Sequence, residues 1–131
     1  MSAQSAIKLL RKHKATLSVA ESITGGGLGN ELTSIAGSSE VFRGGIIAYS
    51  DEVKIKELSV SKTLIKKLSA VSEEVAKEMA IGVRKKFKTD FSIATTGVAG
   101  PGRAYGQKAG TVWIAISSPN NTVAIQLALS G

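Results

Sequence analysis

A polar, glycine-rich turn follows the first short apolar segment of the chain and is the strongest candidate for a functional site. Residues 16–20 predict a buried strand, and Glu21-Ser22-Ile23-Thr24-Gly25-Gly26 comes directly after it. Free backbone N–H groups where such a turn opens a helix suit a phosphate, a carboxylate or a developing oxyanion. The turn lacks the lysine of a P-loop and the Gly-x-Ser-x-Gly pattern of a nucleophile elbow, so a capped turn without a ligand is an equal alternative.

A second polar cluster follows the second predicted strand and contains a candidate general base. In Tyr49-Ser50-Asp51-Glu52-Val53-Lys54, the lysine is expected in the first turn of a helix. The positive end of the helix dipole would there help to lower the pKa of its ammonium group. A neutral lysine amine can deprotonate a serine hydroxyl without any histidine. The alternative, which local sequence alone favours, is a surface lysine paired with Asp51 or Glu57.

Small and hydroxyl-bearing residues also end a third predicted strand. The segment Thr95-Thr96-Gly97-Val98-Ala99-Gly100 leads into a loop that carries Arg103, Tyr105 and Lys108. Small residues at a strand end leave room for a ligand and expose backbone donors, and the loop could close over that ligand. A plain surface turn is the alternative, but three such strand ends are harder to dismiss together than separately.

The elements that position these clusters alternate between helices and strands and then end in two strands. Periodicity and capping predict helices over 3–13, 51–58, 61–68 and 72–88 and after the glycine-rich turn, with strands over 16–20, 45–49, 91–96, 111–117 and 122–129. Ser50 and Ser72 are N-cap residues followed by acidic first turns. We therefore predict a single α/β domain over residues 1–131, in which helices cover a mixed parallel and antiparallel sheet with a C-terminal β-hairpin.

Composition excludes several kinds of site. The chain has no cysteine and a single histidine, His13, which lies between lysines. Disulfides, a cysteine nucleophile, a histidine-dependent triad and a histidine or thiolate metal site are therefore set aside, and no cofactor or metal is expected. No apolar stretch is long enough to span a membrane and the first residues do not form a signal peptide, so we expect a cytoplasmic protein.

The excess of basic residues has two interpretations. Seventeen basic and ten acidic residues give a net charge of +7. Most lysines lie on polar faces or at C-terminal ends of predicted helices, which favours an ordinary solvated surface. The alternative is attraction to an anion, and a phosphorylated small molecule fits better than nucleic acid because aromatic residues are only 5% of the chain. A nucleic-acid-binding domain is therefore the weaker rival, and it predicts strongly salt-dependent binding.

Six motifs in order carry a resemblance to one known family. They are Ala20-Glu21-Ser22-x-Thr24-Gly25-Gly26, Gly37-Ser38-Ser39 with Phe42, Tyr49-Ser50-x-Glu52-x-Lys54, Val71-Ser72-Glu73-Glu74-Val75-Ala76, Thr96-Gly97-x-Ala99-Gly100-Pro101 and Gly110-Thr111-Val112-Trp113. In these residues and their spacing, the chain resembles the CinA C-terminal domain family, the competence- and damage-inducible protein A family.

The resemblance implies a nicotinamide-nucleotide amidase, which hydrolyses nicotinamide mononucleotide to nicotinate mononucleotide and ammonia. It places the family's catalytic serine, lysine and tyrosine on Ser22, Lys54 and Tyr49. The expected substrate-binding residues are Glu21, Thr24, Gly25, Gly26, Thr96, Gly97, Ala99, Gly100 and Arg103. We expect backbone N–H groups around residues 24–26 to hold the oxyanion, and Arg103, Lys108 and the 96–100 loop to meet the phosphate.

Two features depart from the family pattern. The loop over 101–110 is slightly shorter than usual and has Ala109 where members often carry proline. Members also usually continue beyond the final Ser-Gly into an arginine-bearing segment and a helix, so either the chain is truncated at its C-terminal end or it lacks part of the substrate clamp. The alternative function is a catalytically inactive nucleotide-binding or assembly module of the same fold. A homodimer or higher homo-oligomer is expected in either case.

Overall fold

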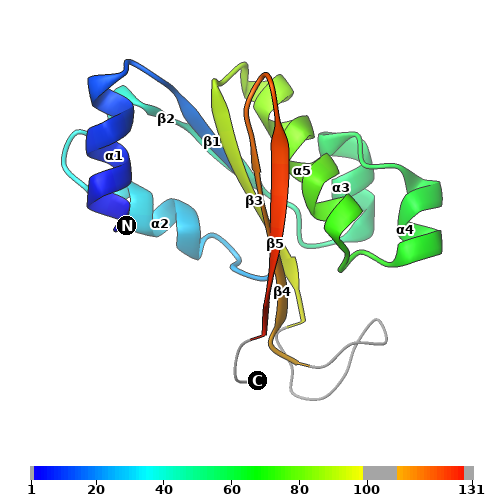
Figure 1. Cartoon of the computed structure of the whole chain (residues 1–131). Coiled ribbons are helices and arrows are strands. Elements are labelled where there is room, and N and C mark those ends of the chain that lie inside the picture. Colours follow the sequence, from blue (N-terminus) through cyan, green and yellow to red (C-terminus); the bar gives the residue numbers. More distant parts are fainter. Residues whose placement is uncertain (1, 99–108, 129–131) are drawn as a thin grey trace.

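The computed structural model describes residues 2–98 and 109–128, which form one sheet between two layers of helices (Figure 1). The elements are α1 (Ala3–Lys12), β1 (Leu17–Glu21), α2 (Gly27–Thr33), the 3-10 helix η1 (Ser38–Glu40), β2 (Phe42–Ile47), α3 (Asp51–Leu58), α4 (Lys62–Leu68), α5 (Glu73–Phe87), β3 (Phe91–Gly97), β4 (Thr111–Ser117) and β5 (Thr122–Ala128). The predicted α/β fold with a mixed sheet and a C-terminal hairpin is confirmed.

The strand order places a topological switch point next to β1. The sheet runs β2-β1-β3-β4-β5, with β1 parallel to both of its neighbours and the last two pairings antiparallel. The chain leaves β1 through α2 on one face and reaches β3 through α3, α4 and α5 on the other face (Figure 1). Ligands of open α/β sheets bind at the carboxyl ends of the strands at such a point. The ends of β1, β2 and β3 are therefore the place to look for a site.

Serine caps begin the three helices between β2 and β3. The hydroxyl oxygens of Ser50, Ser61 and Ser72 each accept a hydrogen bond from the backbone N–H three residues further on. Such a cap satisfies one of the backbone donors that a helix start leaves without a partner. The predicted starts of α3 and α5 follow directly from this chemistry.

Two glycines let α3, α5 and β2 approach their neighbours closely. A Cβ atom at Gly82 of α5 would lie 1.9 Å from the carbonyl oxygen of Leu58, and one at Gly45 would lie 2.4 Å from that of Val19. Neither distance is possible for real atoms, so both positions require glycine. The first contact lets α3 pack directly against α5, and the second lets β2 pair with β1.

The predicted second strand was misplaced. The strand β2 starts at Phe42 and ends at Ile47, whereas the sequence pattern had indicated residues 45–49. Gly44 has a φ of 134°, and the pairing of β1 with β2 shifts register between Leu17 and Ser18, so this strand begins at an irregularity. Such bulges accept glycines that propensity alone would exclude from a strand.

Apolar side chains lie on both faces of the sheet. Val75, Met79 and Val83 of α5 are fully buried against one face, and Ile7 of α1 belongs to the smaller core cluster on the other. Among the described helices, none is both long and apolar enough to cross a membrane.

Candidate active site

Ser22 and Lys54 lie together at the carboxyl ends of β1 and β2. The Lys54 Nζ atom is 3.2 Å from Ser22 Oγ and donates a hydrogen bond to the Ala48 carbonyl oxygen at 2.9 Å. Only 3% of Lys54 and 7% of Ser22 is exposed to solvent. The structure thus joins two predicted site residues from different strand ends in one buried contact, the Ser22–Lys54 pair.

The local sequence explains why this lysine points inwards. The Ser50 cap starts α3 three residues after β2, which puts Lys54 and Leu58 four residues apart on the buried face of that helix. The Ala48 N–H donates to the Glu21 carbonyl oxygen at 2.7 Å and continues the pairing of β1 and β2 beyond the strands. The carbonyl that receives the Lys54 hydrogen bond is therefore held in place by the sheet.

The surroundings of Lys54 favour a neutral amine. Burial lowers the pKa of Lys54, and the nearby Asp51 carboxylate only partly opposes this effect. Both hydrogen-bond partners of Lys54 are uncharged, and the ion pairs of the described residues do not include this lysine. A neutral amine keeps a lone pair that can accept the proton of a serine hydroxyl.

The Glu21 carboxylate occupies the backbone donors at the start of α2. Its Oε1 accepts the N–H groups of Gly26 (3.1 Å) and Leu28 (2.9 Å), and its Oε2 accepts that of Gly29 (2.8 Å). Burial would raise the pKa of Glu21, but hydrogen bonds from the Thr24 hydroxyl and from these N–H groups lower it below its ordinary value. Glu21 is therefore an anion, and it fills the position where the sequence predicted a bound ligand.

This arrangement corrects the predicted oxyanion donors. The Gly25 N–H donates to the Ser22 carbonyl oxygen at 3.1 Å, and the Gly26 N–H is bound by Glu21. Within the described residues, the N–H groups left without a partner in this turn are those of Ile23 and Thr24. Gly25 and Gly26 instead allow the chain to turn, because their φ angles are +56° and +105°.

The third strand end contributes Thr95 rather than Thr96. The Ser22 N–H donates to the Thr95 carbonyl oxygen at 3.1 Å, and the Thr95 and Thr24 hydroxyl oxygens are 2.9 Å apart. The Thr96 hydroxyl donates to the Ala70 carbonyl oxygen, in the buried layer of α5 on the opposite face. Because side chains alternate along a strand, only one of the two threonines can face Ser22. Ile93 and Thr95 are two residues apart and therefore share a face of β3. The apolar Ile93 was the sequence signal that could have identified Thr95 as the residue on that face.

The other predicted residues are less closely tied to the pair. Tyr49 is 72% exposed, and in the described part of the chain no hydrogen bond links its phenol to Ser22 or Lys54. Gly97 leaves space for the turn, since a Cβ there would lie 2.9 Å from the Ile23 Cδ1 atom. Ala99, Gly100 and Arg103, which were predicted to bind substrate, lie outside the described residues.

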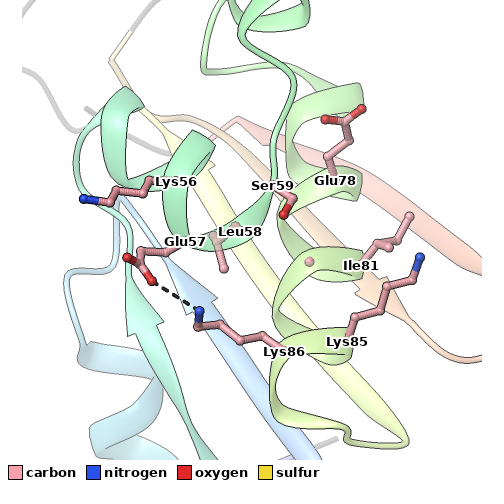
Figure 2. Close-up of a pocket in the computed structure, with 9 residues that line it drawn as sticks. Lys56, Glu57, Leu58, Ser59, Glu78, Ile81, Lys85 and Lys86 are labelled. Carbon is pink, nitrogen blue, oxygen red and sulfur yellow. Dashed lines mark ion pairs between the residues drawn. The ribbon is translucent and has the colours of Figure 1, made fainter.

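A groove between α3 and α5 is separate from this site. Figure 2 shows that its lining is dominated by charged side chains, including Lys56, Glu57, Glu78, Lys85 and Lys86. Glu57 forms an ion pair with Lys86 at 3.2 Å, and Glu78 accepts the Ser61 N–H. None of the predicted site residues lines this groove. Over 2–98 and 109–128, no group of three histidine or acidic residues is placed to hold a metal ion.

Comparisons with known proteins find relatives that match most of this chain. The CinA-like protein of Flavobacterium psychrophilum is 50% identical over 113 residues, covering 86% of this chain and 27% of that protein. The CinA-like protein of Gloeothece citriformis is 52% identical over 115 residues, covering 87% and 28%. The chain thus spans little more than a quarter of the length of these curated relatives.

Solved structures match almost the whole chain. A competence-damaged protein (CinA) superfamily protein from Escherichia coli superposes with a TM-score of 0.95 at 35% identity, covering 98% of this chain and 76% of that one. A competence/damage inducible protein from Agrobacterium tumefaciens gives a TM-score of 0.93 at 32% identity, covering 98% and 79%. The model of the CinA C-terminal domain matches residues 1–131, and the chain therefore belongs to the CinA C-terminal domain family.

Proposed function

We propose that this domain is a serine-lysine amidase that converts nicotinamide mononucleotide to nicotinate mononucleotide and ammonia. The observation that carries the proposal is the buried Ser22–Lys54 pair, in which the lysine's hydrogen-bond partners among the described residues are both uncharged. The choice of substrate rests on the family resemblance. The names of the relatives state only that they are CinA-like.

The chemistry follows from the protonation states. Neutral Lys54 takes the proton of Ser22 as Oγ attacks the carboxamide carbon, and the carbonyl oxygen gains negative charge. The N–H groups of Ile23 and Thr24, which have no partner among the described residues, are our candidate donors for that oxygen. The protonated Lys54 then gives its proton to the departing nitrogen, so that ammonia leaves and an acyl-serine ester remains. Water hydrolyses this ester with Lys54 again acting as base, which releases the nicotinate product.

Ser22→Ala tests the nucleophile. It should lower the rate of ammonia release from nicotinamide mononucleotide roughly a thousandfold or more, because the nucleophile and base act as a unit. The exposed Ser39→Ala is the matched control and should keep the wild-type rate. Near-normal turnover by Ser22→Ala would refute the nucleophile. Substrate binding by calorimetry without ammonia release from the wild-type domain would indicate a binding module instead.

Lys54→Arg tests the base. Arginine keeps N–H donors but is always protonated and cannot accept the serine proton, so this variant should lose turnover over the whole accessible pH range. In the wild type, kcat/KM should rise with pH through the lowered pKa of Lys54, because only the neutral amine accepts the serine proton. Lys56→Arg, on the exposed side of α3, is the control. A Lys54→Arg variant with the wild-type rate and pH profile would refute this role.

A further inference from the structure

Glu21 is the most buried acidic side chain near the Ser22–Lys54 pair, and only 2% of it is exposed. Both of its carboxylate oxygens are engaged: Oε1 accepts two backbone N–H groups and Oε2 accepts a third. A carboxylate with its acceptor sites filled in this way has little capacity left to bind a substrate. The structure thus argues against the predicted role of Glu21 as a substrate-binding residue.

The nucleophile lies in a turn formed by residues 22–26, which we call the Ser22 turn. Hydrogen bonds hold this turn at both ends. At one end, the Ser22 N–H donates to the Thr95 carbonyl oxygen of β3. At the other end, the Gly26 N–H donates to Glu21, which is itself the last residue of β1. The turn is therefore attached to two central strands, and within the described part of the chain the N–H groups of Ile23 and Thr24 have no partner.

We infer that Glu21 is a positioning residue, whose carboxylate fixes the Ser22 turn so that the Ser22 Oγ and the two free N–H groups keep their reactive arrangement. This inference rests on the proposed serine-lysine chemistry. It assigns Glu21 no contact with the substrate and no part in proton transfer. Its effect should therefore fall on turnover rather than on substrate affinity.

Glu21→Gln removes the charge and one acceptor while it keeps the shape of the side chain. A glutamine oxygen can still accept two N–H groups, but its amide nitrogen then faces the Gly29 N–H, donor against donor. We expect kcat for ammonia release to fall about tenfold or more and KM to stay within about threefold, because small displacements of a nucleophile are costly. A raised KM with unchanged kcat would instead show that Glu21 binds substrate, and would overturn the inference.

A pair of glycine variants perturbs the same contact without changing Glu21. A Cβ at Gly29 would lie 3.2 Å from Glu21 Oε2, whereas one at Gly27 would meet no atom within 4 Å. Both glycines are in the first turn of α2, so both alanines strengthen the helix alike. Gly29→Ala should lower kcat by about threefold, and Gly27→Ala should leave it unchanged. Equal kcat values for Gly29→Ala, Gly27→Ala and the wild type would overturn the inference.

A fluorophosphonate separates this inference from the choice of substrate. The reagent phosphonylates an activated serine with loss of fluoride, and it needs no nucleotide recognition. Labelling of Ser22 should slow in Glu21→Gln and Gly29→Ala in proportion to kcat. If the wild type labels on Ser22 but releases no ammonia from nicotinamide mononucleotide, the proposed substrate fails and the labelling rates alone decide the role of Glu21. If the wild type is neither labelled on Ser22 nor releases ammonia, both proposals are refuted. If Glu21→Gln is labelled at the wild-type rate and only unfolds at a lower urea concentration, Glu21 has a structural role alone and the inference is overturned.

Discussion

The buried lysine makes a prediction about stability that does not depend on any substrate. In the folded protein the pKa of Lys54 lies below the ordinary value of 10.5, because burial disfavours the ammonium ion. Between the folded and the unfolded pKa, the unfolded chain therefore binds more protons at this side chain. The free energy of unfolding must rise with pH across that window. The destabilisation caused by burying the charge is fully present below the folded pKa and disappears as the pH approaches 10.5.

Lys54→Met isolates this contribution. The variant loses the hydrogen bonds to Ser22 and Ala48 at every pH, which changes the free energy of unfolding by a constant amount. The titration of the Lys54 amine contributes to the free energy of unfolding of the wild type only. The wild-type free energy of unfolding minus that of Lys54→Met should therefore increase with pH, with a slope of at most about 1.4 kcal/mol per pH unit for one proton.

Urea denaturation of both proteins at intervals from about pH 6 to pH 10 measures this difference. The titrations of all other groups are shared by the two proteins and cancel. Lys56→Met is the matched control, because Lys56 lies in the same helix but is exposed, and its difference from the wild type should be flat. A flat difference for Lys54→Met would show that its amine titrates normally. A difference that falls with pH would show a charge stabilised by a partner, and either result would refute the neutral base.

Two further substitutions test the geometry of the fold and the site. Gly45→Ala should lower the free energy of unfolding, measured by urea denaturation, by about 3 kcal/mol. Its Cβ would lie 2.4 Å from the Val19 carbonyl oxygen and force β1 and β2 apart. An unchanged midpoint would contradict this register. Tyr49→Phe should keep kcat for ammonia release within about threefold, because Lys54 can deliver both proton transfers and the phenol lies in solvent. A loss of a hundredfold or more would assign the proton to Tyr49.

Local signals predicted the elements that hold the site. The caps at Ser50 and Ser72 located the starts of α3 and α5 to the residue, and the run over 111–117 gave β4 its observed bounds. These signals depend on neighbouring residues alone, through capping, periodicity and β propensity. The strand end at Ser22 and the helix at Lys54 followed from the same kind of evidence. Their contact did not, because it depends on how β1 and β2 pair.

The site residues that the structure places differently from the prediction depend on information that neighbouring residues do not contain. The choice between Thr95 and Thr96 depends on which face of β3 is covered by α5, and an offset of one residue reverses the answer. The N–H groups at the start of α2 are bound by the carboxylate of Glu21, which lies five to eight residues earlier in the chain. An acidic residue next to a glycine-rich turn is compatible with both an internal hydrogen-bond partner and a ligand contact, so only the folded geometry separates the two.

The pKa values of both buried ionisable groups of the site are lowered, but for different reasons, because each group has partners of a different kind. Glu21 and Lys54 are not joined by any of the ion pairs between described residues. Backbone N–H groups stabilise the carboxylate as an anion, whereas the hydrogen bonds of Lys54 to described residues are to an uncharged hydroxyl and an uncharged carbonyl oxygen. If Glu21 instead paired with Lys54, the attraction would hold the ammonium ion and remove the base. The hydrogen bonds of Glu21 to the start of α2 therefore hold its carboxylate in the turn that carries Ser22, and no ion pair between described residues joins a carboxylate to Lys54.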